Sequence, residues 1–317
     1  MIHDLNALDL APLYAELSKS GLVRRLIELA RDEDLGPPPG LDATSASIRH
    51  KTRSADALLN ARKACTVAGL AAVPDVLAVY AEALSAPLAF RPLRADGDTV
   101  PANTTLGVIT GPRAAVLAAE RVVLNLISRL SGVATLTRAY ADRIRAEAPG
   151  SPARLYDTRK TTPGLRVLEK YAVRCGGGRS HRLGLYDAAL LKDNHLAGVP
   201  TSELPALVAA AAQSARAAAH TSLRFVQVEA DTLDQLDALL TLPGGVIDIV
   251  LLDNMTPEQM QAAVAKRDRA NPALELEASG NVRLETIGAI ARTGVDRISA
   301  GALTHQATSV DIGLDIP

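Results

Sequence analysis

The sequence predicts an α/β protein in which a parallel sheet fills the C-terminal part and a smaller α+β domain precedes it. From about residue 150 onward, apolar runs recur, each ends in polar residues, and helical segments separate the later ones. This alternation is typical of a βα barrel or a doubly wound sheet. Residues 1–112 lack it. A chain of 317 residues accommodates one large domain and one smaller domain.

Residues 1–112 combine helical segments, turns and short strands, as expected for an α+β domain. Leu22–Arg31 has apolar residues at helical spacing, and the Pro/Gly-rich segment Asp34–Gly40 is expected to be a loop. Three short runs are expected to be strands, with a turn at 96–98 between the last two. These runs are Thr66–Leu70, Pro87–Leu93 and Leu106–Thr110.

The second domain is expected to span residues 113–302 and to open with a long helix. Its helical pattern begins near Pro112 and ends near Glu147, with Gly132 as a candidate interruption. The expected strands are Arg154–Thr158, Ala188–Leu191, Leu223–Val228, Val246–Leu252, Leu274–Ala278 and Val295–Ala300. The expected helices between the later strands are Ala206–Ala219, Leu233–Leu240, Pro257–Ala270 and Arg283–Arg292. Six strands are fewer than the eight of a complete barrel.

The polar residues that end these strands are the first candidates for an active site. In both barrels and doubly wound sheets, the loops at the carboxyl ends of the strands build the active site. Here those loops carry cations, carboxylates and glycines: Arg159, Lys160, Lys192, Glu229, Asp253, Ser279, Gly280 and Gly301.

The segment from Asp157 to His195 concentrates positive charge. It holds five Arg and three Lys against four acidic residues, a balance of +4, whereas the whole chain carries −1. A solvated basic face would also explain this charge. The position of Arg159, Lys160 and Lys192 at strand ends favours an anion-binding site instead. Arg suits planar carboxylates and phosphates, and Lys suits phosphates, so the expected ligand carries both groups.

Two glycine-containing loops and two carboxylates complete the candidate site. Ser279-Gly280-Asn281 precedes the helix expected from Arg283, and backbone N–H groups at a helix start bind phosphate. Gly301 follows the last strand, where barrel folds often bind a phosphate, although either loop would also serve as an ordinary turn. Glu229 and Asp253 would accept hydrogen bonds from ribose hydroxyls or hold a water-rich Mg²⁺, unless they are only solvated.

Composition argues against several other classes of function. The net charge of −1, the aromatic content of 3% and the absence of Trp argue against nucleic-acid binding. Cys65 and Cys175 are expected to be reduced thiols, and the six His lack zinc-ligand spacing. No signal peptide or apolar run long enough to span a membrane is expected. These features together indicate a cytoplasmic enzyme.

The motifs resemble the quinolinate phosphoribosyltransferase family over nearly the whole chain and in the same order. The N-terminal part matches more loosely, through 33–36 and Thr44-Ser45, with an unusual proline loop at 37–39 between them. The segments that carry the resemblance are 120–121, 130–135, Asp157 to Gly164, Gly176-Gly177-Gly178 with His181-Arg182, Leu191 to His195, Val228-Glu229, Leu252-Asp253-Asn254, Glu277 to Gly280 and Ser299 to His305.

This resemblance implies the fold, the reaction and the assembly. The fold would be an N-terminal open-faced α+β sandwich and an incomplete, six- to seven-stranded α/β barrel, with a tail of about 303–317 returning to the first domain. The reaction would convert quinolinate and phosphoribosyl pyrophosphate to nicotinate mononucleotide, pyrophosphate and CO₂, with Mg²⁺, in NAD biosynthesis. The enzyme would be a homodimer or higher homo-oligomer with shared active sites, independent of nucleic acid and membrane.

The resemblance also implies a role for each site residue. Arg159, His181, Arg182 and Lys192 would bind the quinolinate carboxylates, together with Arg121 from the partner subunit. Lys160 would face the phosphoribosyl donor, and Glu229 and Asp253 would bind its ribose and Mg²⁺ directly or through water, so these three are the expected catalytic residues. Ser279, Gly280, Gly301 and His305 would hold the 5′-phosphate.

Three alternatives remain at the level of sequence. One is a related barrel phosphoribosyltransferase for another acid, such as nicotinate, or a molybdenum-associated relative; Lys192 to His195 favours the quinolinate enzyme over the latter. Another is a catalytically inactive ligand-binding relative, which intact Arg159, Lys160, Glu229 and Asp253 disfavour. A barrel aldolase would need an isolated Schiff-base lysine, whereas Lys160 and Lys192 lie among arginines.

Overall fold

The computed structural model describes residues 4–37, 40–47, 53–219 and 223–317. Pro38 and Pro39 of the proline loop lie outside these ranges, as do His3, His50 and His220. By its internal contacts the chain forms two compact units. The barrel unit comprises Met1–Ala7, Ala139–Lys160 and Gly178–Ala302, and the sandwich unit comprises Leu8–Arg138, Thr161–Gly177 and Leu303–Pro317. This division differs from a boundary at residue 112, because helix α5 (Arg113–Glu147) contributes to both units.

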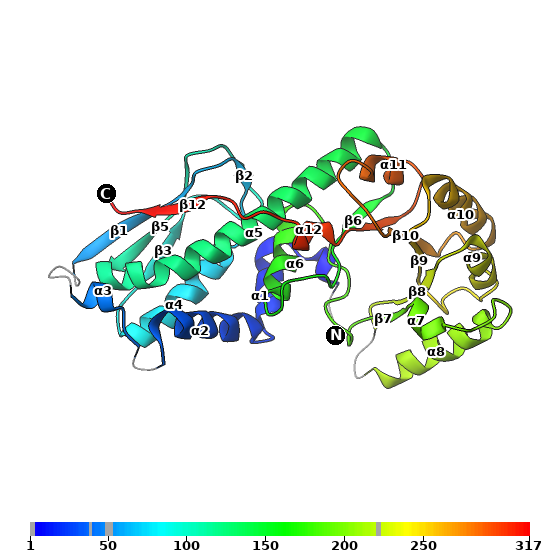
Figure 1. The fold of residues 1–317 in the computed structure, drawn as a ribbon, viewed down its shortest axis with the longest axis horizontal. Coiled ribbons are helices and arrows are strands. Elements are labelled where there is room, and N and C mark those ends of the chain that lie inside the picture. Colours follow the sequence, from blue (N-terminus) through cyan, green and yellow to red (C-terminus); the bar gives the residue numbers. More distant parts are fainter. Residues whose placement is uncertain (1–3, 38–39, 48–52, 220–222) are drawn as a thin grey trace. The chain divides into compact units, whose positions relative to one another are not determined.

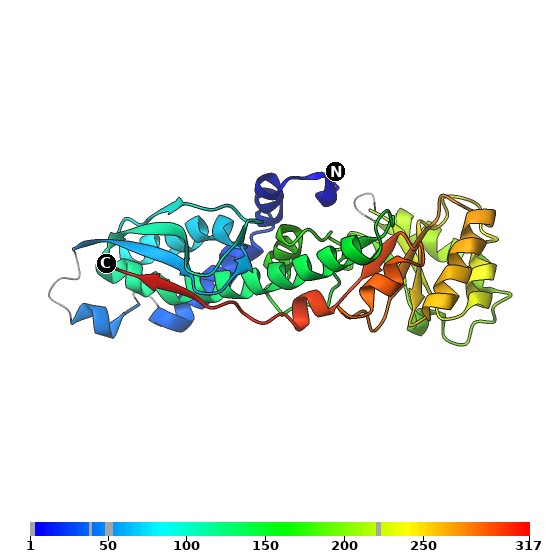
Figure 2. The same cartoon turned by 90° about the horizontal axis from the view of Figure 1, so that it is seen from above.

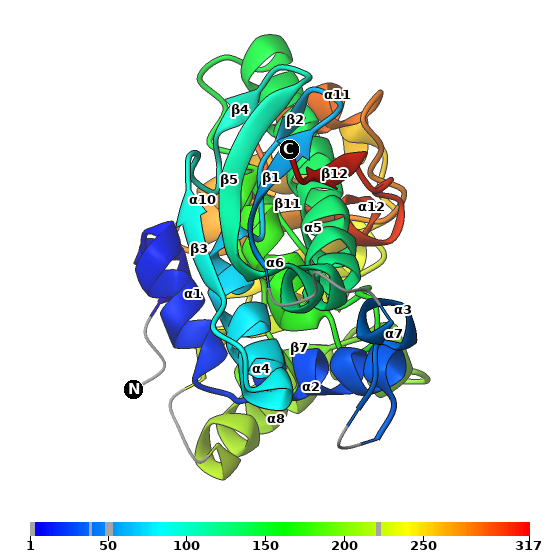
Figure 3. The same ribbon diagram turned by 90° about the vertical axis from the view of Figure 1, so that its left-hand side faces the viewer.

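The sandwich unit contains a four-stranded antiparallel sheet in the order β12-β1-β5-β3 (Figure 3). Alternate residues of β1, such as Ala55 and Ala57, are buried, so one face of the sheet packs on a core. The last strand of the chain pairs with β1 and forms an edge of the sheet. The strands are β1 (Ser54–Ala61), β3 (Ala89–Pro92), β5 (Thr104–Pro112) and β12 (Ile312–Asp315).

Helices and one small ladder complete the sandwich unit. The expected helix at Leu22–Arg31 and the expected strands at Pro87–Leu93 and Leu106–Thr110 are confirmed. The helices are α1 (Leu10–Ser18), α2 (Leu22–Leu35), α3 (Ala43–Ala46), η2 (Leu70–Ala72), α4 (Val73–Leu84) and α6 (Arg166–Cys175), and α12 (Ala302–His305) lies at the unit boundary. The ladder pairs β2 (Cys65–Thr66) with β4 (Thr99–Val100).

Two features of the sandwich unit differ from the sequence-based expectation. The strand expected at Thr66–Leu70 is wrong beyond Thr66, because Gly69 has a φ of 103° and turns the chain into η2. Strand β1 was not expected, since its sequence, SADALLNA, lacks the β-branched residues that favour strands. Its position in the middle of the sheet therefore comes from pairing and burial.

The long helix α5 runs from Arg113 to Glu147 without a break, so the candidate interruption at Gly132 is wrong. Gly132 serves another purpose. A Cβ atom at this position would collide with the backbone of Thr308, in the segment that leads to β12. That segment also bonds to α5 through Val310 N–H and the Ser128 carbonyl, at 3.0 Å. The glycine lets the C-terminal segment lie directly against the helix.

The barrel unit contains six parallel strands in the order β6-β11-β10-β9-β8-β7 (Figure 1). Figure 2 shows the same ribbon from above. All six expected strands are present. Strands β6 and β7 are the edges of this sheet, so the expected α/β class with an incomplete barrel is confirmed. The strands are β6 (Arg154–Tyr156), β7 (Ala189–Leu191), β8 (Val226–Ala230), β9 (Ile249–Asp253), β10 (Glu275–Ser279) and β11 (Arg297–Ser299).

The helices between these strands pack on one another in chain order, α8 on α9, α9 on α10 and α10 on α11. The helix expected at Arg283–Arg292 is shorter than predicted. Residues 283–286 form a turn in which Thr286 N–H donates to the Arg283 carbonyl at 3.1 Å, and α11 begins only at Ile287. The helices are η1 (Leu5–Ala7), α7 (Asp193–Leu196), α8 (Leu204–Ala218), α9 (Leu233–Leu239), α10 (Pro257–Ala270) and α11 (Ile287–Ala291).

The register of the strands places polar side chains together on one face of the sheet. Leu251 pairs with Glu229 and with Glu277, and Glu277 pairs with Arg297. Paired residues point to the same face, and so do alternate residues of one strand. This polar face therefore runs from Arg154, Glu275 and Arg297 near the amino ends to Glu229, Asp253 and Ser279 near the carboxyl ends.

None of the helices formed by the described residues is long and apolar enough to cross a membrane.

Replacing Gly132 with alanine tests the close approach of the C-terminal segment. Alanine normally favours a helix interior by about 1 kcal/mol over glycine, but here its methyl group would meet the Thr308 backbone. We expect the free energy of unfolding to fall by ~1–3 kcal/mol, as measured by denaturant titration. Gly244→Ala is the control, because no heavy atom lies within 4 Å of its Cβ position. An unchanged stability for Gly132→Ala would contradict the close approach.

Candidate active site

Three carboxylates lie together at the carboxyl ends of β8 and β9. Carboxylate oxygens of Glu229, Asp231 and Asp253 all lie within 4.8 Å of one another. The sequence-based prediction included Glu229 and Asp253 but missed Asp231. The spacing of Asp231 could have indicated it, because it lies two residues after Glu229 and alternate residues point to the same face of a sheet. Glu229 itself lies within β8 and is half-buried, whereas the expectation placed it after the strand.

The carboxylates are close enough to disfavour their shared negative charge. The pKa of Glu229 is raised by burial and further by the charge of Asp253. The pKa of Asp253 is raised by burial and further by the charge of Asp231. The charge of Lys192 opposes both shifts, which places this predicted lysine near the cluster. A hard divalent cation prefers such oxygen ligands, so the three residues fit a cation site.

Lys192 stands at the start of α7, where the chain leaves β7. Its backbone N–H donates to Nδ1 of His195 at 2.9 Å, and the next N–H, of Asp193, donates to Oε1 of Glu229 at 3.4 Å. The expected tetrad Lys192 to His195 is therefore a helix cap that presents the exposed lysine beside the carboxylates.

Two neighbouring arginines of the barrel unit, Arg159 and Arg182, have weak hydrogen-bond partners. The buried Arg182 has its pKa lowered by burial and by the charge of the neighbouring Arg159, and the charge of Asp187 opposes this shift only in part. Nη1 of Arg182 donates a long hydrogen bond, 3.3 Å, to the carbonyl of Ala188. Nε of Arg159 is buried without a hydrogen-bond partner among the described residues. Two adjacent cations with weak partners favour an anionic ligand.

His181 is buried and contacts the backbone of Arg182. Its Nδ1 accepts a hydrogen bond from the backbone N–H of Arg182 at 2.8 Å, and its Nε2 faces Oε1 of Glu277 at 3.3 Å. The side chain is only 7% exposed. In this arrangement His181 fixes the backbone of Arg182.

Glu277 and Arg297 support His181 and were not predicted as site residues. Nε of Arg297 donates to Oε2 of Glu277 at 2.8 Å, and the Arg297 guanidinium lies 3.8 Å from the ring centroid of Tyr156. Burial raises the pKa of Glu277, but the contact with His181 and the charge and hydrogen bond of Arg297 outweigh it and hold the pKa well below its usual range. The strand register brings Glu277 beside Arg297.

The loop after β10 is held against the carboxylates through Asn254. The φ of Gly280 is +87°, and a Cβ atom there would collide with the Asn254 side chain. Nδ2 of Asn254 donates to Asp253 at 2.6 Å, and Nδ2 of Asn281 donates to Oδ1 of Asn254 at 3.1 Å. Because α11 begins at Ile287, the helix expected to begin at Arg283, close behind Ser279-Gly280-Asn281, is wrong in its starting position. The loop nevertheless lies beside Asp253.

The remaining predicted residues have the following positions. Gly301 follows β11 and precedes α12. Lys160 is exposed, and its backbone N–H bonds to Oγ1 of Thr158 at 3.0 Å. Arg121 on α5 and His305 at the end of α12 are exposed and belong to the sandwich unit. The triple glycine ends α6, where a Cβ atom on Gly176 would collide with α5.

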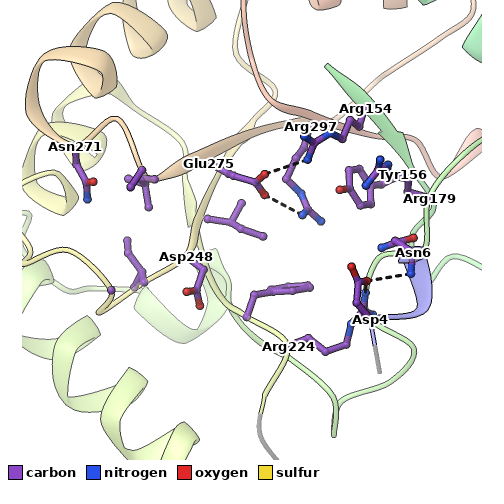
Figure 4. Close-up of a pocket in the computed structure, with 16 residues that line it drawn as sticks. Asp4, Asn6, Arg154, Tyr156, Arg179, Arg224, Asp248, Asn271, Glu275 and Arg297 are labelled. Carbon is purple, nitrogen blue, oxygen red and sulfur yellow. Dashed lines mark hydrogen bonds and ion pairs between the residues drawn. The ribbon is translucent and has the colours of Figure 1, made fainter. Parts of the chain in front are cut away.

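A separate pocket of about 710 Å³ opens at the opposite, amino ends of the strands (Figure 4). Its charged residues largely satisfy one another: Glu275 lies 3.1 Å from Arg297 and 3.6 Å from Arg154, and Asp248 pairs with Arg216. The uncompensated charges instead lie at the carboxyl ends, where parallel α/β folds place their chemistry. We therefore assign the candidate active site to the carboxyl ends.

The fold and the site define an α/β enzyme that binds anionic substrates near a cluster of carboxylates. Two family models match the chain: quinolinate phosphoribosyl transferase, N-terminal domain, over residues 42–131, and C-terminal domain, over residues 133–315. The chain belongs to the quinolinate phosphoribosyl transferase family.

Individual relatives agree with the family assignment. The chain is 45% identical over 221 residues to the nicotinate-nucleotide pyrophosphorylase [carboxylating] of Mycobacterium leprae, covering 70% of this chain and 72% of the relative. It is 38% identical over 284 residues to a probable nicotinate-nucleotide pyrophosphorylase [carboxylating] of Bacillus subtilis, covering 90% of both. The structure of the Francisella tularensis nicotinate-nucleotide pyrophosphorylase matches with a TM-score of 0.78 and 32% identity, covering 99% of both chains.

Replacing Glu229 with glutamine tests the electrostatics of the carboxylate cluster. A raised pKa means that the fold disfavours the ionised form, so ionised Glu229 lowers the free energy of unfolding at neutral pH. In EDTA at pH 7 we expect Glu229→Gln to have a Tm equal to or above that of the wild type, and this difference should vanish as pH falls and the carboxylate protonates.

The same variant should lose the response to a divalent cation. At about 100 times its Kd, the cation should stabilise the wild type by about 2.7 kcal/mol, and Glu229→Gln far less. Asp237→Asn is the control, because Asp237 pairs with Lys266 on the surface. Equal stabilisation of wild type and Glu229→Gln would exclude a cation site at the cluster.

Proposed function

We propose that this chain catalyses the reaction of quinolinate with phosphoribosyl pyrophosphate to nicotinate mononucleotide, pyrophosphate and CO₂, in NAD biosynthesis. The observation that carries this proposal is the pair Arg159 and Arg182, two neighbouring guanidinium groups with weak hydrogen-bond partners, whose repulsion the charge of Asp187 offsets only in part. A ligand with two adjacent carboxylates matches two neighbouring guanidinium groups. The relatives named as nicotinate-nucleotide pyrophosphorylases support the same reaction.

The pair Arg159 and Arg182 also favours binding of quinolinate over nicotinate, which is the substrate of the first rival, a related barrel phosphoribosyltransferase. Quinolinate carries two carboxylates and nicotinate carries one, so nicotinate would leave part of the repulsion between Arg159 and Arg182 uncompensated. His181 would act in acceptor binding by holding Arg182, and Lys192 would add a further charge near the ring.

The sugar transfer would use the carboxylates. As the pyridine nitrogen attacks C1′ of the ribose, the bond from C1′ to pyrophosphate breaks, and the sugar carbon gains positive charge. Glu229 and Asp253 would stabilise that charge electrostatically. Burial and nearby carboxylates raise the pKa values of both residues, so a neighbouring positive charge would favour their ionised forms.

We also propose that Mg²⁺ binds at Glu229, Asp231 and Asp253, directly or through water. When bound, it would supply charge neutralisation for the pyrophosphate leaving group. Lys160 would contribute to the same neutralisation from the end of β6, and Ser279, Gly280, Gly301 and His305 would hold the 5′-phosphate.

Decarboxylation would follow from the transfer itself. Once its nitrogen carries the ribose, the ring is cationic and accepts the electron pair of the bond between C2 and the carboxylate, so CO₂ leaves and C2 takes up a proton. This sequence needs no protein nucleophile. A mechanism without a protein nucleophile agrees with the state of the two cysteines. Cys65 and Cys175 are both buried, and burial raises the pKa of each thiol.

For the assembly, we propose a homodimer or higher oligomer in which Arg121 completes the acceptor site of the partner subunit. The exposure of Arg121 on α5 supports this, since such a cation is available to another chain. We place the enzyme in the cytoplasm, where buried reduced thiols are stable.

Incubation of the purified protein with phosphoribosyl pyrophosphate, Mg²⁺ and either quinolinate or nicotinate tests the reaction. We expect nicotinate mononucleotide and CO₂ from quinolinate. Arg182→Lys should lose about 2 kcal/mol or more of transition-state binding, or roughly 30-fold in kcat/KM. Arg179→Lys, at the opposite ends of the strands, is the control. Turnover with nicotinate alone would support the first rival, and no turnover with either acid would support an inactive relative.

Mixed dimers test the shared site. We expect Arg121→Ala and Arg159→Ala each to abolish most activity, because each removes a cation that the acceptor needs. Mixing the two variants after dissociation should restore part of the activity, since some mixed dimers would contain one intact site. Mixtures as inactive as the separate variants, with mixed dimers verified by mass spectrometry, would count against a site shared between subunits.

A further inference from the structure

We propose that Arg129 and Glu169 are positioning residues for the phosphoribosyl donor, because they hold the backbone next to Lys160 and next to His305. This inference rests on the proposed function, in which both of those residues contact the donor. All the contacts below lie within the sandwich unit.

Glu169 is a fully buried carboxylate whose oxygens accept hydrogen bonds from two separate segments. It lies on α6 with an exposure of 0%. The loop after Lys160 provides two donors, the backbone N–H of Thr162 at 3.0 Å and its hydroxyl at 2.9 Å. Nε and Nη2 of Arg129 donate to Oε1 at 3.0 and 2.7 Å. A carboxylate without solvent access depends on all of these donors.

Arg129 carries the connection on to the C-terminal segment. From α5, its Nη1 donates to the carbonyl of Ala307 at 2.6 Å, and its Nη2 donates to the carbonyl of Thr304. These carbonyls lie on either side of His305 and Gln306, at the end of α12. The planar guanidinium has donors enough to reach a carboxylate and two carbonyls at once, which an ammonium group on a flexible stem does not reproduce.

The position of this pair in the chain gives it a role beyond stability. Thr162 is two residues after Lys160, and Thr304 is three residues after Gly301 and directly before His305. One buried ion pair therefore fixes the backbone beside three residues that are assigned to the two phosphate ends of the donor. A displacement of about 1 Å in such groups costs on the order of 100-fold in rate.

Within the acceptor pair, Arg182 does not share this support, whereas Arg159 directly precedes Lys160. Arg182 is held by His181, which faces Glu277 within the barrel unit, and Glu277 accepts a hydrogen bond from Arg297. Loss of Arg129 should therefore weaken donor binding more than quinolinate binding, whereas general destabilisation would weaken both equally.

The test uses three variants of the intact protein. Arg129→Lys keeps the positive charge but not the planar set of guanidinium donors. Glu169→Gln removes the negative charge of the carboxylate that accepts these hydrogen bonds. Thr162→Val removes only the hydrogen bond from the threonine hydroxyl. Thr162→Val is the mildest, so it keeps the test informative if the other two variants fold poorly. The Kd for phosphoribosyl pyrophosphate with Mg²⁺ is measured by calorimetry without an acceptor, and KM and kcat follow with quinolinate.

Arg267→Lys is the matched control. Arg267 is also a buried arginine, 7% exposed, that pairs with Asp296 at 2.5 Å and donates to the carbonyl of Leu274 at 2.7 Å. It lies in the barrel unit near the amino ends of the strands, away from the donor residues. It therefore reports the effect of losing a buried arginine fork without a link to the donor.

We expect Arg129→Lys and Glu169→Gln to raise the Kd and KM for the donor at least about tenfold, and Thr162→Val to raise them less. The Kd for quinolinate should rise much less than that for the donor, and Arg267→Lys should lower the Tm without changing donor affinity. Equal weakening of donor and quinolinate, or an unchanged donor Kd in folded Arg129→Lys or Thr162→Val, would overturn the inference. Donor binding without turnover of quinolinate would contradict the proposed reaction but not this role.

Discussion

Parallel pairing of the six strands is the constraint on which the rest of the barrel unit depends. It brings the ends of β8, β9 and β10 to one edge and so gathers Glu229, Asp231, Asp253 and Ser279. The same pairing places Glu277 beside Arg297 and lets both support His181. The site therefore does not depend on one motif, because each strand contributes one or two side chains to a shared face.

The charges at this edge are arranged at some cost to stability. Arg159 and Arg182 lie close without a strong acceptor, and nearby the pKa values of Glu229 and Asp253 are raised by burial and by neighbouring carboxylates. By contrast, charged residues elsewhere in the described chain, such as Arg267 with Asp296 or Lys266 with Asp237, form pairs. Folding alone does not favour unbalanced groups of like charge, whereas binding of an oppositely charged ligand does. The unbalanced charges at the carboxyl ends of the strands therefore indicate ligand binding, whereas the ion pairs at the amino ends do not.

The sandwich unit shows how segments distant in sequence are joined. Gly132 lets the C-terminal segment approach α5, β12 completes the sheet that contains β1, and Arg129 connects α5, α6 and the end of α12. In this way the loop that follows the first strand of the barrel and the segment that follows the last are held by the same few contacts. We regard this as the structural reason for the return of the chain to its first domain.

By itself, the sequence determined the α/β class and the six strands and indicated most residues of the candidate site, because alternating apolar runs and strand-end motifs are local patterns. It missed Asp231, Glu277 and Arg297, since their roles arise from strand register and from a buried network that no local pattern records. It also placed His181 and the Ser279 loop only approximately. Only the tertiary structure decided that His181 faces Glu277 and that α11 begins at Ile287. The reason is that burial and hydrogen bonding between distant segments determine side-chain direction and helix ends.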